Sequence, residues 1–114
     1  MVMFPKLDAK RLTLVGGTGT STSSAATINA AAGTITTESL TTAAGATYTM
    51  TLTNSFIAAA DVVLCTVSST GTGSPAITEV TPAAGTCVIL VQNVHASAAF
   101  NAVLLIKFAV VKAG

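Results

Sequence analysis

Charged side chains are scarce in this chain. Only 8% of its 114 residues are Asp, Glu, Lys or Arg, against roughly a quarter in typical soluble domains. Its net charge is +1, with five basic and four acidic residues, so there is no basic patch of the kind that binds nucleic acid. So few charges protect a monomer poorly against association. We therefore expect hydroxyl groups to solvate the surface and partner chains to cover part of it.

Histidine and cysteine are also rare, and tryptophan is absent. One histidine, His95, and two cysteines, Cys65 and Cys87, do not form a metal-ligand pattern. Both cysteines lie in apolar runs, which favours buried thiols over a disulfide. We expect neither a metal nor a cofactor.

No catalytic motif is found. No serine lies in a Gly-x-Ser-x-Gly turn, and the carboxylates of Glu38, Asp61 and Glu79 are interpreted as solvated strand ends. Gly16–Gly19 follows an apolar stretch, as in a dinucleotide-binding turn, but the next residues lack the apolar spacing of a helix. We expect His95 to cap a loop or touch a partner, and the protein not to be an enzyme.

Long hydrophobic runs are missing as well. The longest aliphatic stretch, near the C-terminus, is interrupted by Lys107, well short of the roughly 20 residues that span a membrane. The N-terminal sequence MVMFPKLDAKRL has no apolar core before a cleavage site. We expect no membrane partner and synthesis in a cytoplasm.

Period-two alternation is the main structural signal. In Thr47–Asn54, Tyr48, Met50 and Leu52 point to one side and threonines to the other, which predicts a half-buried strand. Short segments of strand character recur along the chain, separated by Gly, Pro, Asn and Ser. They are Arg11–Val15, Ala26–Asn29, Thr34–Thr37, Val62–Ser68, Ala76–Thr81, Thr86–Val94 and Ala102–Val111. The pattern predicts an all-β fold: one small antiparallel β-sandwich or jelly-roll-like domain of about eight strands, with an extended N-terminal arm.

Three Ala-Ala-Gly sequences recur along the chain. Thr42–Asn54 and Thr81–Asn93 share this triplet, a following strand and a closing Asn, and the third triplet is Ala31–Gly33. Glycine after small residues supplies the positive φ of a tight turn. We interpret the triplets as recurring turns, with coincidence in a low-complexity chain as the alternative.

The composition divides the chain into three parts. Residues 1–15 form an arm with the first strand, residues 16–25 a connector rich in Gly, Thr and Ser, and residues 26–114 the sandwich domain. Phe4 is expected to anchor the arm, whereas Tyr48, Phe56, Phe100 and Phe108 are assigned to the core. The arm residues expected to contact a partner are Met3, Phe4, Pro5, Lys6, Leu7, Lys10 and Arg11.

Two C-terminal segments are apolar on both faces. In Thr86–Val94 and Ala102–Val111, large apolar residues occupy both alternating positions, and such strands are covered on both sides in stable proteins. Because a sandwich covers only one face of each sheet, we expect a homo-oligomer. Its interface is predicted at Val88, Leu90, Val103 and Leu105.

Two long stretches carry a resemblance to a known family: FPKLDAKRLTLVGGTGTSTSSAATINAAAGTITTESLTTAAGATYTMTLTN and the later TPAAGTCVILVQNVHASAAFNAVLLIKF. The chain resembles small virion proteins of tailed bacteriophages over nearly its whole length. The resemblance implies a non-enzymatic capsid decoration (cement) or head-fibre protein, β-rich and usually trimeric. It would bind the major capsid protein on the capsid surface and stabilise the head. The alternative is a small fibre or tail component that binds a host surface or carbohydrate. A small hydrolase relying on His95 is a third possibility, disfavoured because no catalytic constellation is present.

Overall fold

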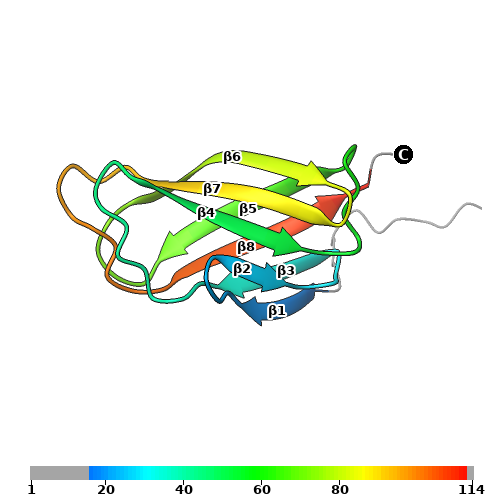
Figure 1. Cartoon of the computed structure of the whole chain (residues 1–114), viewed down its shortest axis with the longest axis horizontal. Helices are drawn as coiled ribbons and strands as arrows, with labels where there is room; N and C mark the ends of the chain where they lie inside the picture. The colour runs from blue at the N-terminus through cyan, green and yellow to red at the C-terminus, as the bar shows by residue number, and fades with distance from the viewer. Residues whose placement is uncertain (1–15, 113–114) are drawn as a thin grey trace, which may run out of the picture.

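The computed structural model describes residues 16–112, which form eight β-strands in two four-stranded sheets packed face to face (Figure 1). The predicted all-β sandwich is confirmed. The predicted strand Arg11–Val15 and the rest of the arm lie outside the described residues. The strands are β1 (Gly16–Thr20), β2 (Ala25–Thr27), β3 (Ala32–Thr36), β4 (Thr47–Thr53), β5 (Val62–Ser69), β6 (Pro75–Ala83), β7 (Thr86–Asn93) and β8 (Leu104–Val111).

Two of the strand pairings are parallel. Sheet A has the order β1-β3-β8-β5 and sheet B the order β2-β4-β7-β6. The pairings β1–β3 and β2–β4 are parallel, and the other four are antiparallel. The expectation of a purely antiparallel sandwich is therefore wrong for β1 and β2. Because the chain changes sheet at each of its first three connections, β3 returns beside β1 in the same direction, and β4 likewise returns beside β2. The strand order thus differs from that of an antiparallel jelly roll.

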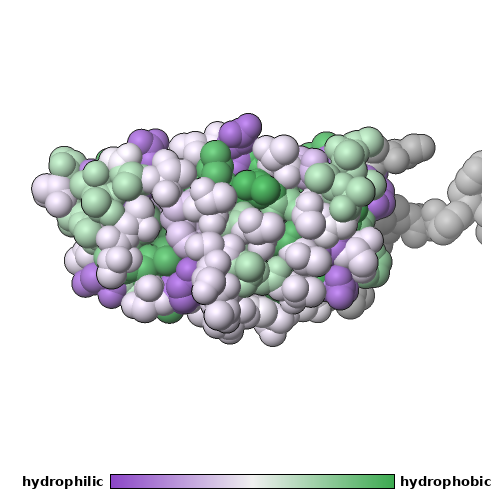
Figure 2. Space-filling view, viewed as in Figure 1, coloured by the Kyte–Doolittle hydropathy of each residue, from purple (hydrophilic) through white to green (hydrophobic). Residues whose placement is uncertain are grey.

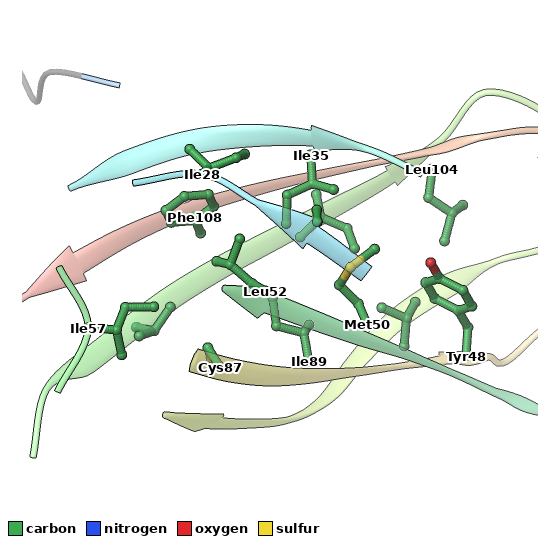
Figure 3. Packing of buried hydrophobic residues seen from close by; sticks show 14 of the residues in the cluster. Ile28, Ile35, Tyr48, Met50, Leu52, Ile57, Cys87, Ile89, Leu104 and Phe108 are labelled. Carbon is green, nitrogen blue, oxygen red and sulfur yellow. The ribbon is translucent and has the colours of Figure 1, made fainter. Parts of the chain in front are cut away.

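The core lies between the sheets and follows the predicted alternation. Tyr48, Met50 and Leu52 of β4 are buried, and they face the side chains of sheet A (Figure 3). β7 and β8, which are apolar on both faces, each bury one of these faces in the core. Their buried side chains are Cys87, Ile89, Val91, Leu104, Ile106, Phe108 and Val110.

The glycines of β1 leave room for the side chain of Ile28. The predicted connector over residues 16–25 is wrong for Gly16–Thr20, which pairs with β3 along its full length. A Cβ at Gly19 would lie 2.8 Å from the Ile28 side chain, and one at Gly17 would lie 3.0 Å from it. Both separations are below ordinary van der Waals contact, so only glycine on the inner face of β1 lets Ile28 pack there. The chain then continues into β2, with no helix, which removes the dinucleotide-binding interpretation.

Two Ala-Ala-Gly triplets are turns related by a local twofold arrangement. Gly45 and Gly85 have φ values of 82° and 77°. The Asn93 backbone N–H donates to the Ala46 carbonyl, and the Asn54 N–H donates to the Gly85 carbonyl. Each closing asparagine thus lies beside the turn of the other copy, across the antiparallel β4–β7 pair. The third triplet is not a turn, because Ala32 and Gly33 belong to β3.

Candidate functional site

The Glu38 carboxylate lies in a cluster of hydroxyl groups where β1 turns into β2. Oε1 accepts hydrogen bonds from Ser21 Oγ and, at 3.1 Å, from the Tyr48 hydroxyl. Oε2 accepts from the Ser24 backbone N–H at 3.0 Å. Ser23 and Ser24 have positive φ values of 50° and 66°, so the carboxylate holds a turn that the backbone adopts at some cost.

The electrostatics of this cluster argue for a structural role. Burial raises the pKa of Glu38, but hydrogen bonds from Ser21, the backbone and Tyr48 outweigh it and leave the pKa below its ordinary value. Such a group has no proton to give at neutral pH and is a weak base. Burial is also the main reason that the pKa of Tyr48 is raised. The expectation that Glu38 is a solvated strand end is wrong, because both of its carboxylate oxygens are bonded.

His95 and Asp61 also hold loops in place. His95 Nδ1 accepts the backbone N–H groups of Ser97 at 3.0 Å and Ala98 at 2.8 Å, which confirms that it caps a loop. The Asp61 side chain is 3% exposed, and its Oδ2 lies 2.5 Å from Lys112 Nζ. Asp61 is therefore a buried carboxylate paired with the exposed Lys112, and not a solvated strand end. Glu79, by contrast, is exposed on β6.

The two cysteines are free thiols, as expected. Burial, with a smaller contribution from the nearby Cys87, raises the pKa of Cys65 to about 12. Burial also raises the pKa of Cys87. Neither thiol is therefore poised to react as a thiolate near neutral pH.

Alkaline pH should destabilise the protein through Cys65. The unfolded thiol titrates near pH 8.5, whereas the folded thiol titrates near pH 12. Its contribution to stability is therefore complete below about pH 8.5 and falls progressively as pH rises toward 12. We expect urea unfolding to show a lower free energy of unfolding at pH 10.5 than at pH 8, with a smaller difference in Cys65→Val. Equal losses in both proteins would contradict this assignment.

Neither a metal nor a membrane site is apparent in the described part of the chain. Residues 16–112 hold no group of three or more His, Cys, Asp or Glu side chains arranged to bind a metal ion. Within the same residues, no helix has the length and apolarity required to cross a bilayer.

The surface is nearly uncharged but carries exposed apolar side chains. Figure 2 shows a face on which most residues are close to neutral in hydropathy and few are strongly hydrophilic. Val62, Leu64 and Val111 are 54%, 58% and 49% exposed. Val62 pairs with Val111 across β5 and β8, and Leu64 follows on the same face. We call these three residues the β5/β8 patch.

The other large exposed apolar residues are Phe56 and Val94. Phe56 is 50% exposed, so its predicted place in the core is wrong. Its carbonyl accepts a hydrogen bond of 2.7 Å from Lys112 Nζ, the residue after β8, so it lies at the same end of the sandwich as the β5/β8 patch. Val94 is 55% exposed, at the far end of β7.

The four predicted interface residues do not form one surface. Val88 and Leu90 are half-buried on the outer face of sheet B, between the threonines of β4 and the residues of β6. Leu105 is half-buried on the outer face of sheet A, and Val103 precedes β8. The β5/β8 patch cannot be recognised from the sequence, because Val62 and Leu64 alternate with Val63 and Cys65 and both faces of β5 therefore look equally apolar. The predicted arm residues Met3–Arg11 lie outside the described residues.

Comparisons of the chain with protein-family models, with curated proteins and with solved structures found no match.

Proposed function

We propose that the protein is a non-enzymatic structural component of a tailed-bacteriophage virion. In this role it binds the assembled capsid surface as a homo-oligomer and stabilises it, with the major capsid protein as its partner. The proposal joins the sequence resemblance to a sandwich that offers surfaces for assembly.

The contacts made by the ionisable side chains support a structural role. Glu38, Asp61 and His95 all bond to neighbouring parts of the sandwich. A catalytic group instead needs a free lone pair or proton directed at a substrate. These three side chains serve to position turns and strand ends.

The observation that carries the proposal is the β5/β8 patch and its position. Gly16, Ala32, Ala109 and Leu64 form one row across sheet A. Gly16, the first described residue, therefore lies at the end of the sandwich that carries the patch. A protein that assembles through its N-terminal segment and this end would have its apolar surface covered in the virion.

The aromatic residues favour this role over carbohydrate binding. Carbohydrate-binding modules stack exposed rings on sugars. Among residues 16–112, Tyr48, Phe100 and Phe108 are buried, which leaves Phe56 as the exposed aromatic ring. A single ring of this kind does not make a stacking platform.

Deletion of residues 1–15 tests the proposal. The deletion removes none of the eight described strands, since β1 begins at Gly16, so the sandwich should still fold. We expect co-sedimentation with purified capsids to fall to background, because the predicted capsid-contact residues are removed. Val94→Lys should co-sediment like the wild type.

One outcome would contradict the role of the arm, and another would contradict capsid binding itself. Unchanged capsid binding by a folded deletion variant would remove the arm from the interface. A wild-type protein that binds a glycan array but ignores capsids would instead support the fibre or tail alternative. Circular dichroism of each variant establishes that the fold is retained.

A further inference from the structure

The two sheets end in four edge strands, and two of these are too short to pair extensively. β1 has five residues, three of them glycine, and β2 has three residues. Short edge strands offer few unpaired backbone groups to another chain. This side of the sandwich is therefore a poor template for strand addition.

The edge strand of sheet B carries three features that oppose pairing. β6 begins with Pro75 and contains Pro82, neither of which has a backbone N–H to donate. Its register with β7 shifts between Ile77 and Glu79, and Glu79 places a charge on the strand. Prolines, bulges and charges are the usual means by which proteins prevent edge-to-edge association.

The edge strand of sheet A has none of these features. β5 is eight residues long and contains no charged residue, proline or glycine. Its register with β8 is continuous from Val62 to Ser69. Val62 and Leu64 are more than half exposed on its outer face. A long, regular and apolar edge of this kind is a predicted site of strand pairing.

We propose that β5 pairs antiparallel with β5 of a second copy of this chain. A twofold axis near Leu64 of β5 would join two copies of sheet A into one continuous eight-stranded sheet. Antiparallel self-pairing is isologous, so each chain supplies the same strand and the contact closes as a dimer.

The side chains of β5 favour a second copy as the occupant. Because β5 is uncharged, self-pairing brings no like charges opposite each other. With the axis near Leu64, the two Leu64 side chains would lie opposite each other and next to both Val62 side chains. The pairing would extend the β5/β8 patch across the dimer, since Val111 lies beside Val62. The nearest lysine on sheet A, Lys107, is on β8 and not on the pairing strand.

The closing experiment measures solution mass by light scattering over a range of concentrations, without capsids. We expect the wild type to be a dimer of the 11.2 kDa chain. Leu64→Lys should weaken dimerisation at least roughly a hundredfold, because each dimer loses two apolar contacts and gains two like charges near the axis. Val94→Lys, at an equally exposed valine outside β5, should remain a dimer.

Three results would overturn the inference: a wild-type monomer at all concentrations, a trimer such as the phage resemblance implies, or a Leu64→Lys dimer of undiminished strength. If Leu64→Lys does not fold, Val62→Lys replaces it, since that side chain is also more than half exposed. The measurement is independent of capsid binding. A failed pairing therefore leaves the capsid proposal standing, and a failed capsid assay leaves the dimer standing.

Discussion

Replacing Gly33 with alanine is expected to destabilise the protein by about 3 kcal/mol, at the upper end for overpacking a core. A Cβ at this position would lie 2.9 Å from the Gly17 carbonyl oxygen and 2.9 Å from the Phe108 ring. One obstacle is backbone of the neighbouring strand, and the other is a buried ring. Neither moves away without disturbing the β1–β3 pairing, so β1 should loosen as well.

Gly45→Ala is the matched control for Gly33→Ala. Gly33 is in an extended strand, so alanine there meets a packing obstacle but no backbone strain. At Gly45 a Cβ meets nothing within 4 Å, but φ is 82°, so the expected cost is purely conformational and about 1 kcal/mol. Urea unfolding followed by circular dichroism measures both. A Gly33→Ala protein as stable as Gly45→Ala would mean that β1 does not pack on β3 as described.

Gly33 also illustrates why β1 was missed from the sequence. Strand prediction relies on β-branched and aromatic residues, and Gly16–Thr20 has three glycines in five positions. The side chain that packs on the glycines of β1 belongs to Ile28, eight or more positions further along the chain. It packs onto the bare backbone at Gly17 and Gly19. Tertiary contacts of this kind leave no local pattern, and the sequence alone therefore predicts a connector.

The long strands were predictable because one face of each is buried. β4 alternates threonine with Tyr48, Met50 and Leu52, and all three of these are buried. Such alternation fixes both the strand and the side facing the core. The sequence does not fix which strands become neighbours. β1 is parallel to β3, and β2 to β4, because of the way the chain passes between the two sheets. No pattern in the sequence predicts this.

The exposed apolar patch on β5 and β8 could not be located from the sequence. A chain with few charges and doubly apolar strands favours association, and the predicted interface residues are Val88, Leu90, Val103 and Leu105. In the sandwich Val88 and Leu90 are half-covered by neighbours within sheet B. Val62 and Leu64 are the more exposed because β5 is an edge strand with a neighbour on one side only. The exposure of Val62 and Leu64 therefore follows from the position of β5 at the edge of sheet A.

Substitution of Asn93 by alanine is expected to cost about 4 kcal/mol, because it removes four hydrogen bonds from a fully buried site. The Asn93 side chain is 0% exposed. Its Nδ2 donates to the Thr42 carbonyl at 3.2 Å and to the Ala98 carbonyl at 2.8 Å. Its Oδ1 accepts the N–H groups of Ser74 and His95, each at 3.1 Å. One side chain thus joins three loops, and alanine leaves four backbone groups without this partner.

Asn54 and Asn101 provide a graded comparison for this prediction. Asn54 is equally buried but makes two side-chain hydrogen bonds, to the Ala30 carbonyl and from the Phe56 N–H, so Asn54→Ala should cost about 2 kcal/mol. Asn101 is exposed and accepts one bond, from the Thr72 N–H, so Asn101→Ala should cost less than about 1 kcal/mol. Urea unfolding of the three variants should reproduce this order. Equal losses at Asn54 and Asn93 would contradict the prediction, because the two sites match in burial and differ in the number of hydrogen bonds.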